Sequence, residues 1–258
     1  MPVKTSINVA YFCPMRITTI CLFILLFETT ASFAQSFKQV AFNAQDQLQI
    51  SADEYVVNKN ATYIILLHQA RSSRGEFREI APRFNKLGYN CLAVDLRSGN
   101  EGSGVTNETA LRAGNFGKSM EFIDATQDIM AAIAYAEAKS RKNVILLGSS
   151  YSASLALITG KDDPRVKAVM AFSPGEYFDI KLNVQKSING FNKPVFVGCA
   201  ADEEPYVQTL MSEVVSVKKL IFAPSAGGKH GAKSLTKANK NQNDYWLNII
   251  NFLKDIKD

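Results

Sequence analysis

The sequence predicts an α/β protein with a mostly parallel central sheet of about eight strands and helices on both faces. Three observations predict it: short continuous apolar runs, intervening stretches with apolar residues at helical spacing, and the alternation of the two along the chain. Continuous apolar runs are typical of strands that are covered on both faces, as in a parallel sheet. The alternation favours such a sheet over a sandwich or a bundle.

The predicted strands begin with an antiparallel pair, because two runs of strand-forming residues are separated only by a turn at residues 43–46. Six further apolar runs, each bounded by polar or turn-forming residues, predict buried strands. In chain order the eight strands are residues 39–43, 48–57, 63–67, 91–96, 144–147, 166–172, 195–199 and 220–222.

The predicted helices occupy the segments between these strands, where apolar residues recur three and four positions apart. They are residues 77–87, 122–136, 151–159, 207–215 and 246–253. Pro82 is expected to kink or shorten the first helix, and Gly88 has the position of its C-terminal cap. Residues 97–118, rich in Gly, Asn and Ser, predict a long surface loop. The segment 173–193 is too short to hold a lid domain.

The first 34 residues have the pattern of an export signal. Met15, an alternative start, and Arg16 precede an apolar run at residues 17–27, and the small residues Ser32 and Ala34 follow it. A membrane-spanning helix needs about 20 apolar residues, more than this run offers. We therefore predict a signal peptide at residues 1–34 and one domain at residues 35–258, periplasmic or secreted, without stable membrane insertion after cleavage. A retained membrane anchor is the alternative.

Composition and charge exclude several functions. The 258 residues are 47% hydrophobic and 21% charged, a globular mixture, and the formal net charge of +5 comes without an Arg/Lys block interleaved with aromatics. Nucleic acid is therefore not an expected partner. The absence of metal-binding and nucleotide-binding motifs predicts no metal and no cofactor. Cys91 and Cys199 each lie in an apolar strand-like run, so we expect both to be buried and unpaired.

Residues 148–152 (GSSYS) carry the first chemical signal, because they lie between a predicted strand and a predicted helix. A G-x-S-x-G turn needs small residues around a central nucleophilic serine, since the chain bends sharply there. Gly148 meets this need, Ser152 replaces the second glycine, and Ser150 is the central residue.

A serine hydroxyl needs a neighbouring base, and the base needs a carboxylate to orient it. The chain has only two histidines, and His230 lies in a loop after the last predicted strand. Asp202 follows the preceding strand, which gives the chain order Ser…Asp…His that is expected of this turn. Glu203 and Glu204 are its rivals, interpreted as solvated residues that lead into the next helix.

These motifs resemble the α/β-hydrolase superfamily, and within it small serine esterases similar to dienelactone hydrolases. The resemblance rests on residues 68–75 (HQARSSRG), 94–99 (VDLRSG), 148–152, the Asp202 loop and 229–231 (KHG), and it extends from about residue 38 to the end. It implies the α/β-hydrolase fold without a large cap domain. It also implies that Ser150, Asp202 and His230 are nucleophile, acid and base. Dienelactone hydrolases have a cysteine nucleophile, so Ser150 favours a general serine esterase.

The loop at His68 is expected to supply the oxyanion hole together with the residue after the nucleophile. The expected donors are the N–H groups of Tyr151 and Ala70, with Gln69 next in line. Gln69 and Arg71 are also the expected substrate-binding residues. His68 is interpreted as a residue that braces the loop.

A basic rim around this site is a further hypothesis. Arg71 and Arg74 flank the oxyanion loop, and four lysines without an acid among them follow: Lys229, Lys233, Lys237 and Lys240. Such a rim would steer an anionic substrate. The alternative is that these are solvated loop residues.

Together these observations predict a serine hydrolase that cleaves small carboxylic esters through an acyl-enzyme. A peptidase of the same fold, or a non-catalytic binding protein on the same scaffold, is the alternative. The expected partner is a small-molecule ester. The sequence leaves the oligomeric state and the acyl and alcohol specificity open.

Overall fold

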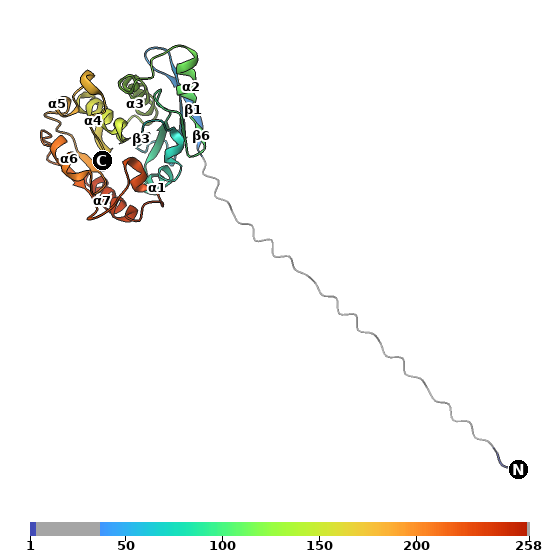
Figure 1. Ribbon diagram of the computed structural model, residues 1–258. Helices are drawn as coiled ribbons and strands as arrows, with labels where there is room; N and C mark the ends of the chain where they lie inside the picture. Colours follow the sequence, from blue (N-terminus) through green and yellow to red (C-terminus); the bar gives the residue numbers. More distant parts are fainter. Residues whose placement is uncertain (4–36, 257–258) are drawn as a thin grey trace. The chain divides into compact units, whose positions relative to one another are not determined.

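The central sheet has the predicted eight strands, in the order β1-β2-β4-β3-β7-β8-β9-β10. The computed structural model describes residues 1–3 and 37–256 (Figure 1), so nearly all of the predicted signal peptide lies outside the described residues. The sheet strands are β1 Lys38–Asn43, β2 Gln49–Tyr55, β3 Tyr63–Leu67, β4 Asn90–Val94, β7 Val144–Ser149, β8 Val166–Phe172, β9 Val195–Gly198 and β10 Lys219–Phe222.

The sheet is parallel except at one edge, where β1 and β2 lie. β1 pairs with β2, and β2 with β4, in antiparallel fashion, while every other pair in the sheet is parallel. All five residues of β3 are buried. Successive side chains of a strand point to opposite faces, so Ile65 and Leu67 enter one hydrophobic cluster and Ile64 and Leu66 the other.

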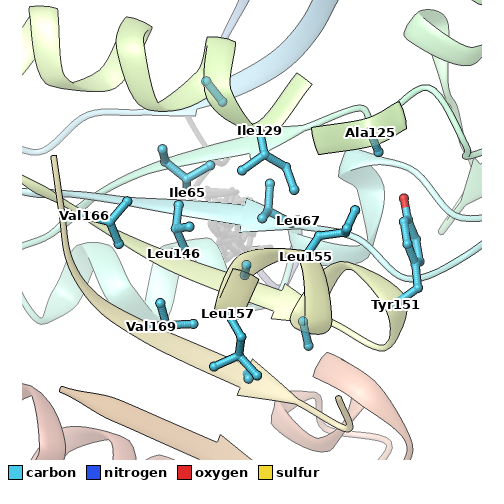
Figure 2. Packing of buried hydrophobic residues seen from close by; sticks show 14 of the residues in the cluster. Ile65, Leu67, Ala125, Ile129, Leu146, Tyr151, Leu155, Leu157, Val166 and Val169 are labelled. Atoms are coloured by element: carbon cyan, nitrogen blue, oxygen red, sulfur yellow. The ribbon is translucent and has the colours of Figure 1, made fainter. Parts of the chain in front are cut away.

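Helices cover both faces, as predicted. The cluster on one face contains residues of α3 (Thr126–Ser140), α4 (Tyr151–Asp162) and α6 (Glu204–Leu210). Figure 2 shows Ile129 of α3 close to Ile65 and Leu67 of β3.

The cluster on the other face contains residues of α1 (Ala81–Lys86) and α7 (Gln242–Lys254). These two helices lie side by side in Figure 1, and the rings of Phe84 and Trp246 are 4.9 Å apart.

The first helix is shortened, as expected at Pro82. The chain forms a 3-10 turn, η1 (Arg74–Phe77), and α1 begins only at Ala81, so that Pro82 lies in its first turn. A proline is tolerated there because the first N–H groups of a helix have no partner within the helix. Gly88 follows α1 with φ 89°, a conformation that favours glycine.

The prediction of an irregular loop at residues 97–118 is wrong. This segment forms a small hairpin, β5 (Glu101–Gly102) and β6 (Val105–Thr106), followed by helix α2 (Glu108–Asn115). The Asn107 side chain caps α2 by accepting from Ala110 N, and the Thr109 hydroxyl accepts from Ser51 N at 2.9 Å. Polar side chains, and not an apolar stripe, hold this helix, so periodicity did not reveal it.

The segment between β8 and β9 holds only two short helices, η3 (Asp179–Lys181) and α5 (Val184–Ser187). The two remaining 3-10 turns are η2 (Phe122–Ala125) and η4 (Gly231–Leu235). Cys91 and Cys199 are both buried and unpaired, as predicted. Within residues 1–3 and 37–256, no helix has the length and apolar character needed to cross a membrane.

Candidate active site

Ser150 lies at the sharp turn between β7 and α4. Its backbone has φ 60° and ψ −126°, outside the regions that non-glycine residues usually occupy, and its N–H donates to Phe172 O of the neighbouring strand at 2.8 Å. Strain of this kind persists only where the surroundings hold it, and it concentrates at functional sites. The turn presents the Ser150 side chain at the carboxyl end of the parallel strands, where open α/β sheets bind ligands.

The small residues around Ser150 have the predicted steric role. A Cβ at Gly148 would lie 2.4 Å from Ser152 O and 2.5 Å from Ala153 Cα, so only glycine fits there. Ser152, which replaces the second glycine of the motif, is fully buried. Its hydroxyl accepts from Ser149 N at 2.9 Å and lies 2.8 Å from Leu67 O, so this serine ties the start of α4 to the end of β3.

His230 reaches Ser150 from the loop after β10. Its Nε2 lies 2.8 Å from the Ser150 Oγ, as the predicted pairing of base and nucleophile requires. The loop can approach Ser149 closely because residue 231 is glycine. Gly231 has φ 66°, and a Cβ there would lie only 2.5 Å from the Ser149 hydroxyl. That hydroxyl accepts from Ala232 N at 2.8 Å. The His230 side chain is 46% exposed, open enough to exchange protons with a bound substrate.

Glu203, and not the predicted Asp202, is the carboxylate that contacts His230. The Glu203 Oε1 accepts from His230 Nδ1, while Asp202 is exposed. The two residues are neighbours in the turn between β9 and α6, so their side chains leave the chain in different directions. The Glu203 Oε2 accepts from Ala200 N at 2.9 Å, which directs this carboxylate back towards the sheet.

Ser173, which sequence analysis missed, braces both the acid and the histidine loop. Its hydroxyl donates to the Glu203 Oε2 at 2.6 Å and accepts from Gly231 N at 2.9 Å. Burial alone would raise the pKa of Glu203, but hydrogen bonds from His230, Ser173 and Ala200 N hold that pKa below its ordinary value. The one available signal is the Ser-Pro-Gly sequence at residues 173–175, which predicts a turn after β8 without revealing its partners.

Because an ionised carboxylate only accepts hydrogen bonds, the proton of the neutral His230 ring is on Nδ1. Nε2 is then free to accept the Ser150 hydroxyl proton. This is the arrangement in which a histidine acts as a base towards a serine.

The loop after β3 is braced from both sides. His68 is fully buried; its Nε2 accepts from Leu96 N at 2.9 Å and its Nδ1 donates to Gln69 O at 2.7 Å, which confirms its bracing role. Gln69 N donates to the Glu76 carboxylate at 2.9 Å, so this N–H is already occupied. In the part of the chain that the structure describes, the N–H groups of Ala70 and Tyr151 donate to no protein acceptor. Of the expected oxyanion donors, these two therefore remain open.

The predicted basic rim is wrong for Arg74. Its side chain is buried and forms ion pairs with Asp53, Asp95 and Glu108, because η1 begins at this residue and directs the guanidinium inward. Arg71 is exposed, with φ 57°.

A cleft of about 790 Å³ opens beside His230, and Gln69, Arg71, Lys229 and Lys233 line it. Lys237 and Lys240 are not among its lining residues. Among residues 1–3 and 37–256, no group of three or more His, Cys, Asp or Glu is placed to hold a metal ion.

The fold is that of the α/β hydrolases, and the family comparison shows that the chain is a hydrolase of this class. The model of the family described as serine aminopeptidase, S33, matches residues 58–204, more than half of the chain, and the chain belongs to this family. The predicted resemblance to α/β hydrolases is thus confirmed. Among curated proteins, no sequence matches this chain.

Solved structures give the same fold. An esterase of Pyrococcus furiosus is similar at 20% identity, covering 85% of this chain and 92% of that chain, with a TM-score of 0.66. A dienelactone hydrolase of Anabaena variabilis is similar at 15% identity over 74% of this chain and 88% of that chain, with a TM-score of 0.58. The α/β hydrolase GrgF of a Penicillium species is similar at 12% identity over 85% of this chain and 98% of that chain, with a TM-score of 0.65. At these identities the likeness concerns the fold.

Proposed function

We propose that this hydrolase is a serine esterase with Ser150 as nucleophile, His230 as base and Glu203 as the acid that orients His230. One observation carries the proposal: the Ser150 Oγ lies 2.8 Å from His230 Nε2 while His230 Nδ1 contacts Glu203. The sequence offers one other histidine, His68, and it is fully buried with both ring nitrogens in contact with protein groups. A binding protein has no need of a strained serine aligned with a histidine and a carboxylate, so this contact disfavours the non-catalytic alternative.

In the proposed reaction the Ser150 Oγ attacks the ester carbonyl carbon as its proton moves to His230 Nε2. Glu203 stabilises the imidazolium that forms and keeps the ring in position. The N–H groups of Tyr151 and Ala70 donate to the oxygen that gains negative charge, each contributing on the order of 3 kcal/mol. His230 then gives its proton to the departing alcohol oxygen. Water, activated by the same histidine, releases the acid from Ser150.

The proposal is tested by hydrolysis of p-nitrophenyl acetate and butyrate by the protein and by its Ser150→Ala variant. We expect the variant to lose roughly 10⁴-fold or more of kcat, because removing the nucleophile of such a unit abolishes nearly all of its catalysis. A fluorophosphonate probe should label the protein and leave the variant unlabelled. Equal rates in the two proteins would exclude Ser150 as the nucleophile.

Amide hydrolysis is the second candidate, because the description of the family names an aminopeptidase. Peptidases of this fold usually carry an extra domain or lid, and the segment between β8 and β9 holds only η3 and α5. We therefore expect p-nitrophenyl butyrate to be cleaved and amino-acid p-nitroanilides to remain at background. Efficient release of p-nitroaniline that disappears in Ser150→Ala would favour the peptidase.

We also propose that the chain is exported and that residues 1–34 are removed as a signal peptide. The short apolar run at residues 17–27 and the small residues Ser32 and Ala34 support this. N-terminal sequencing of protein recovered from the periplasm or medium should begin at Gln35. Recovery of the intact chain in the membrane fraction would favour the retained anchor.

A further inference from the structure

Two hollows of different chemistry lie beside the Ser150–His230 pair. The first is the cleft of about 790 Å³ that His230 itself lines, together with the charged residues Arg71, Glu76, Glu79, Glu101, Lys229 and Lys233. The second is a pocket of about 340 Å³ lined mostly by apolar and aromatic side chains, with three charged residues at its lining as well: Met120, Phe122, Ile123, Tyr177 and Phe178, together with Glu121, Asp179 and Lys181.

The apolar pocket adjoins the nucleophile through Tyr177. Burial raises the pKa of the Tyr177 hydroxyl, and a contact with the Ser150 side chain opposes the rise, so the two hydroxyls are neighbours. The Tyr177 hydroxyl donates to Ser173 O at 2.9 Å, which holds the ring in place. Phe122 stacks on Tyr151, the residue after the nucleophile, with ring centroids 4.4 Å apart. An ion pair between Lys181 and Glu121 joins the two segments that form the pocket.

The proposed reaction indicates which part of the ester binds in the cleft and which in the pocket. His230 must deliver its proton to the alcohol oxygen as that oxygen leaves, so the alcohol part of the ester lies on the side of His230. That side is the charged cleft. The acyl part stays on Ser150, whose other neighbour is Tyr177 of the apolar pocket.

The charged cleft is unsuited to an apolar alcohol, since burying charged side chains under apolar groups removes their water without replacing it. It is equally unsuited to a simple anion. Its three cations, Arg71, Lys229 and Lys233, face three carboxylates, Glu76, Glu79 and Glu101, in the same lining.

Glu76 is only 7% exposed, and its Oε1 has no hydrogen-bond partner in the described part of the chain. Its Oε2 accepts from Gln69 N at 2.9 Å, which fixes this carboxylate among the cations that line the cleft. A group that fits this cleft must therefore donate to carboxylates as well as accept from cations.

From these contacts we propose that the substrates are esters of an apolar acid with a polyhydroxylated alcohol such as a sugar. Each sugar hydroxyl both donates and accepts hydrogen bonds, so it matches a lining of mixed charge without carrying a charge itself. The acyl chain would occupy the pocket at Phe122 and Tyr177, and the sugar the cleft at Arg71 and Glu101. This inference rests on the proposed esterase function and names its substrate class.

The test compares three butyrate esters of primary alcohols: 6-O-butyrylglucose, hexyl butyrate and O-butyrylglycolate. Hydrolysis is followed by acid release, and each rate is normalised to the hydroxide-catalysed rate of the same ester. We expect kcat/KM for the glucose ester to exceed that for the hexyl ester by about tenfold or more, the effect of a few added hydrogen bonds. With glucose kept constant, butyryl should exceed acetyl by about tenfold or somewhat more, because two more methylenes are buried.

Two cleft variants, Glu101→Gln and Lys233→Gln, locate the effect. Both side chains are exposed and make no hydrogen bond or ion pair with any described residue, so their replacement leaves the fold intact. Each should lower kcat/KM for 6-O-butyrylglucose by about three- to tenfold. The ratio of the glucose ester to hexyl butyrate should fall by at least as much, because removing a charge does not penalise an apolar alcohol. The matched controls Glu213→Gln and Lys240→Gln, exposed residues outside the cleft, should change neither substrate.

Three outcomes would overturn the inference: hexyl butyrate hydrolysed as well as the glucose ester, the glycolate ester preferred, or the cleft variants behaving as the controls do. A preference for the glycolate ester would mean that the cations of the cleft dominate and that the alcohol is anionic. In each case turnover of p-nitrophenyl acetate and fluorophosphonate labelling of Ser150 would still support the esterase. Loss of both of those signals would instead refute the proposed function.

Discussion

The two histidines of the chain make a direct comparison, because each lies in a loop that follows a parallel strand. His68 is fully buried, and its ring nitrogens contact the backbone of Leu96 and Gln69 and the side-chain amide of Asn107. His230 is 46% exposed, and its nitrogens face two side chains, Ser150 and Glu203. The first histidine holds a loop in place, whereas the second can exchange a proton with a substrate.

Burial also makes the two histidines differ in their protonation chemistry. Desolvation lowers the pKa of His68, so its ring stays neutral and serves as a fixed donor and acceptor. His230 has a carboxylate on one side and a hydroxyl on the other, so a positive charge that forms on its ring is stabilised at once. The same residue type thus serves structure where its partners are buried, as at His68, and chemistry where they are open to a ligand, as at His230.

Replacing His230, the histidine that contacts Ser150, should lower activity more than replacing Glu203 does. The variant His230→Ala is expected to lose about 10⁴- to 10⁶-fold of kcat with p-nitrophenyl butyrate, since Ser150 loses its base. Because the side chain is half exposed, the melting temperature should shift by only about a few degrees. Steady-state kinetics and thermal unfolding measure the two. A loss of activity below about tenfold would contradict the role of His230 as base.

Replacing the carboxylate should produce the next largest effect, and it separates two adjacent residues. Glu203→Gln keeps the shape of the side chain but lets its amide present a donor to His230 Nδ1, so we expect kcat to fall by about 10²- to 10⁴-fold. Asp202→Asn, the matched control on an exposed neighbour, should stay within about twofold. The reverse ranking would restore Asp202 as the acid.

The ease of prediction differed along the fold for a physical reason. The strands at residues 63–67 and 166–172 coincide with β3 and β8, because a run of apolar residues has few alternatives to a buried strand. The hairpin and helix within residues 97–118 could not be predicted from the pattern of apolar residues. β5 and β6 have two residues each, and side-chain hydrogen bonds hold α2. Elements of that kind depend on partners that lie far along the chain.

The same distinction runs through the site. Ser150 and His230 could be predicted because the turn around the serine is a local pattern and histidine is scarce in this chain. The choice between Asp202 and Glu203 depends on the hydroxyl of Ser173, which lies in the bend after β8. The inward path of Arg74 likewise depends on Asp53 and Asp95, which lie about 20 residues away on either side.

Replacing His68, the buried histidine, should affect stability more than replacing His230 does. The variant His68→Ala removes a fully buried ring and leaves the N–H of Leu96 without its acceptor, so we expect unfolding to become easier by about 2–4 kcal/mol. Denaturant unfolding measures this, with His230→Ala as the counterpart of small effect. If His230→Ala were the more destabilising of the two, the division between a structural and a reactive histidine would be wrong.

The smallest expected effect concerns the pH dependence of stability at Glu203. Burial acts to raise the pKa of Glu203 in the folded protein. The hydrogen bonds from His230 and Ser173 outweigh burial, so the pKa is lowered. A carboxyl group with a lowered folded pKa binds fewer protons folded than unfolded. Its stabilising contribution is therefore fully present above the unfolded pKa of about 4.3 and is lost as the pH falls through the folded value.

Wild type and Glu203→Gln should accordingly differ in melting temperature at pH 6 and converge as the pH falls below about 4, where the wild-type carboxyl is protonated and resembles the amide. Asp202→Asn should show no such convergence, because the exposed Asp202 carboxyl has no hydrogen bond from His230 to lose. A difference for Glu203→Gln that is constant from pH 6 to about pH 3 would mean that shape, and not charge, is what the site requires of Glu203 in the resting protein. Since the histidine proton faces this carboxylate, a charge-dependent difference would tie the stability of the loop at His230 to the same contact that orients the base.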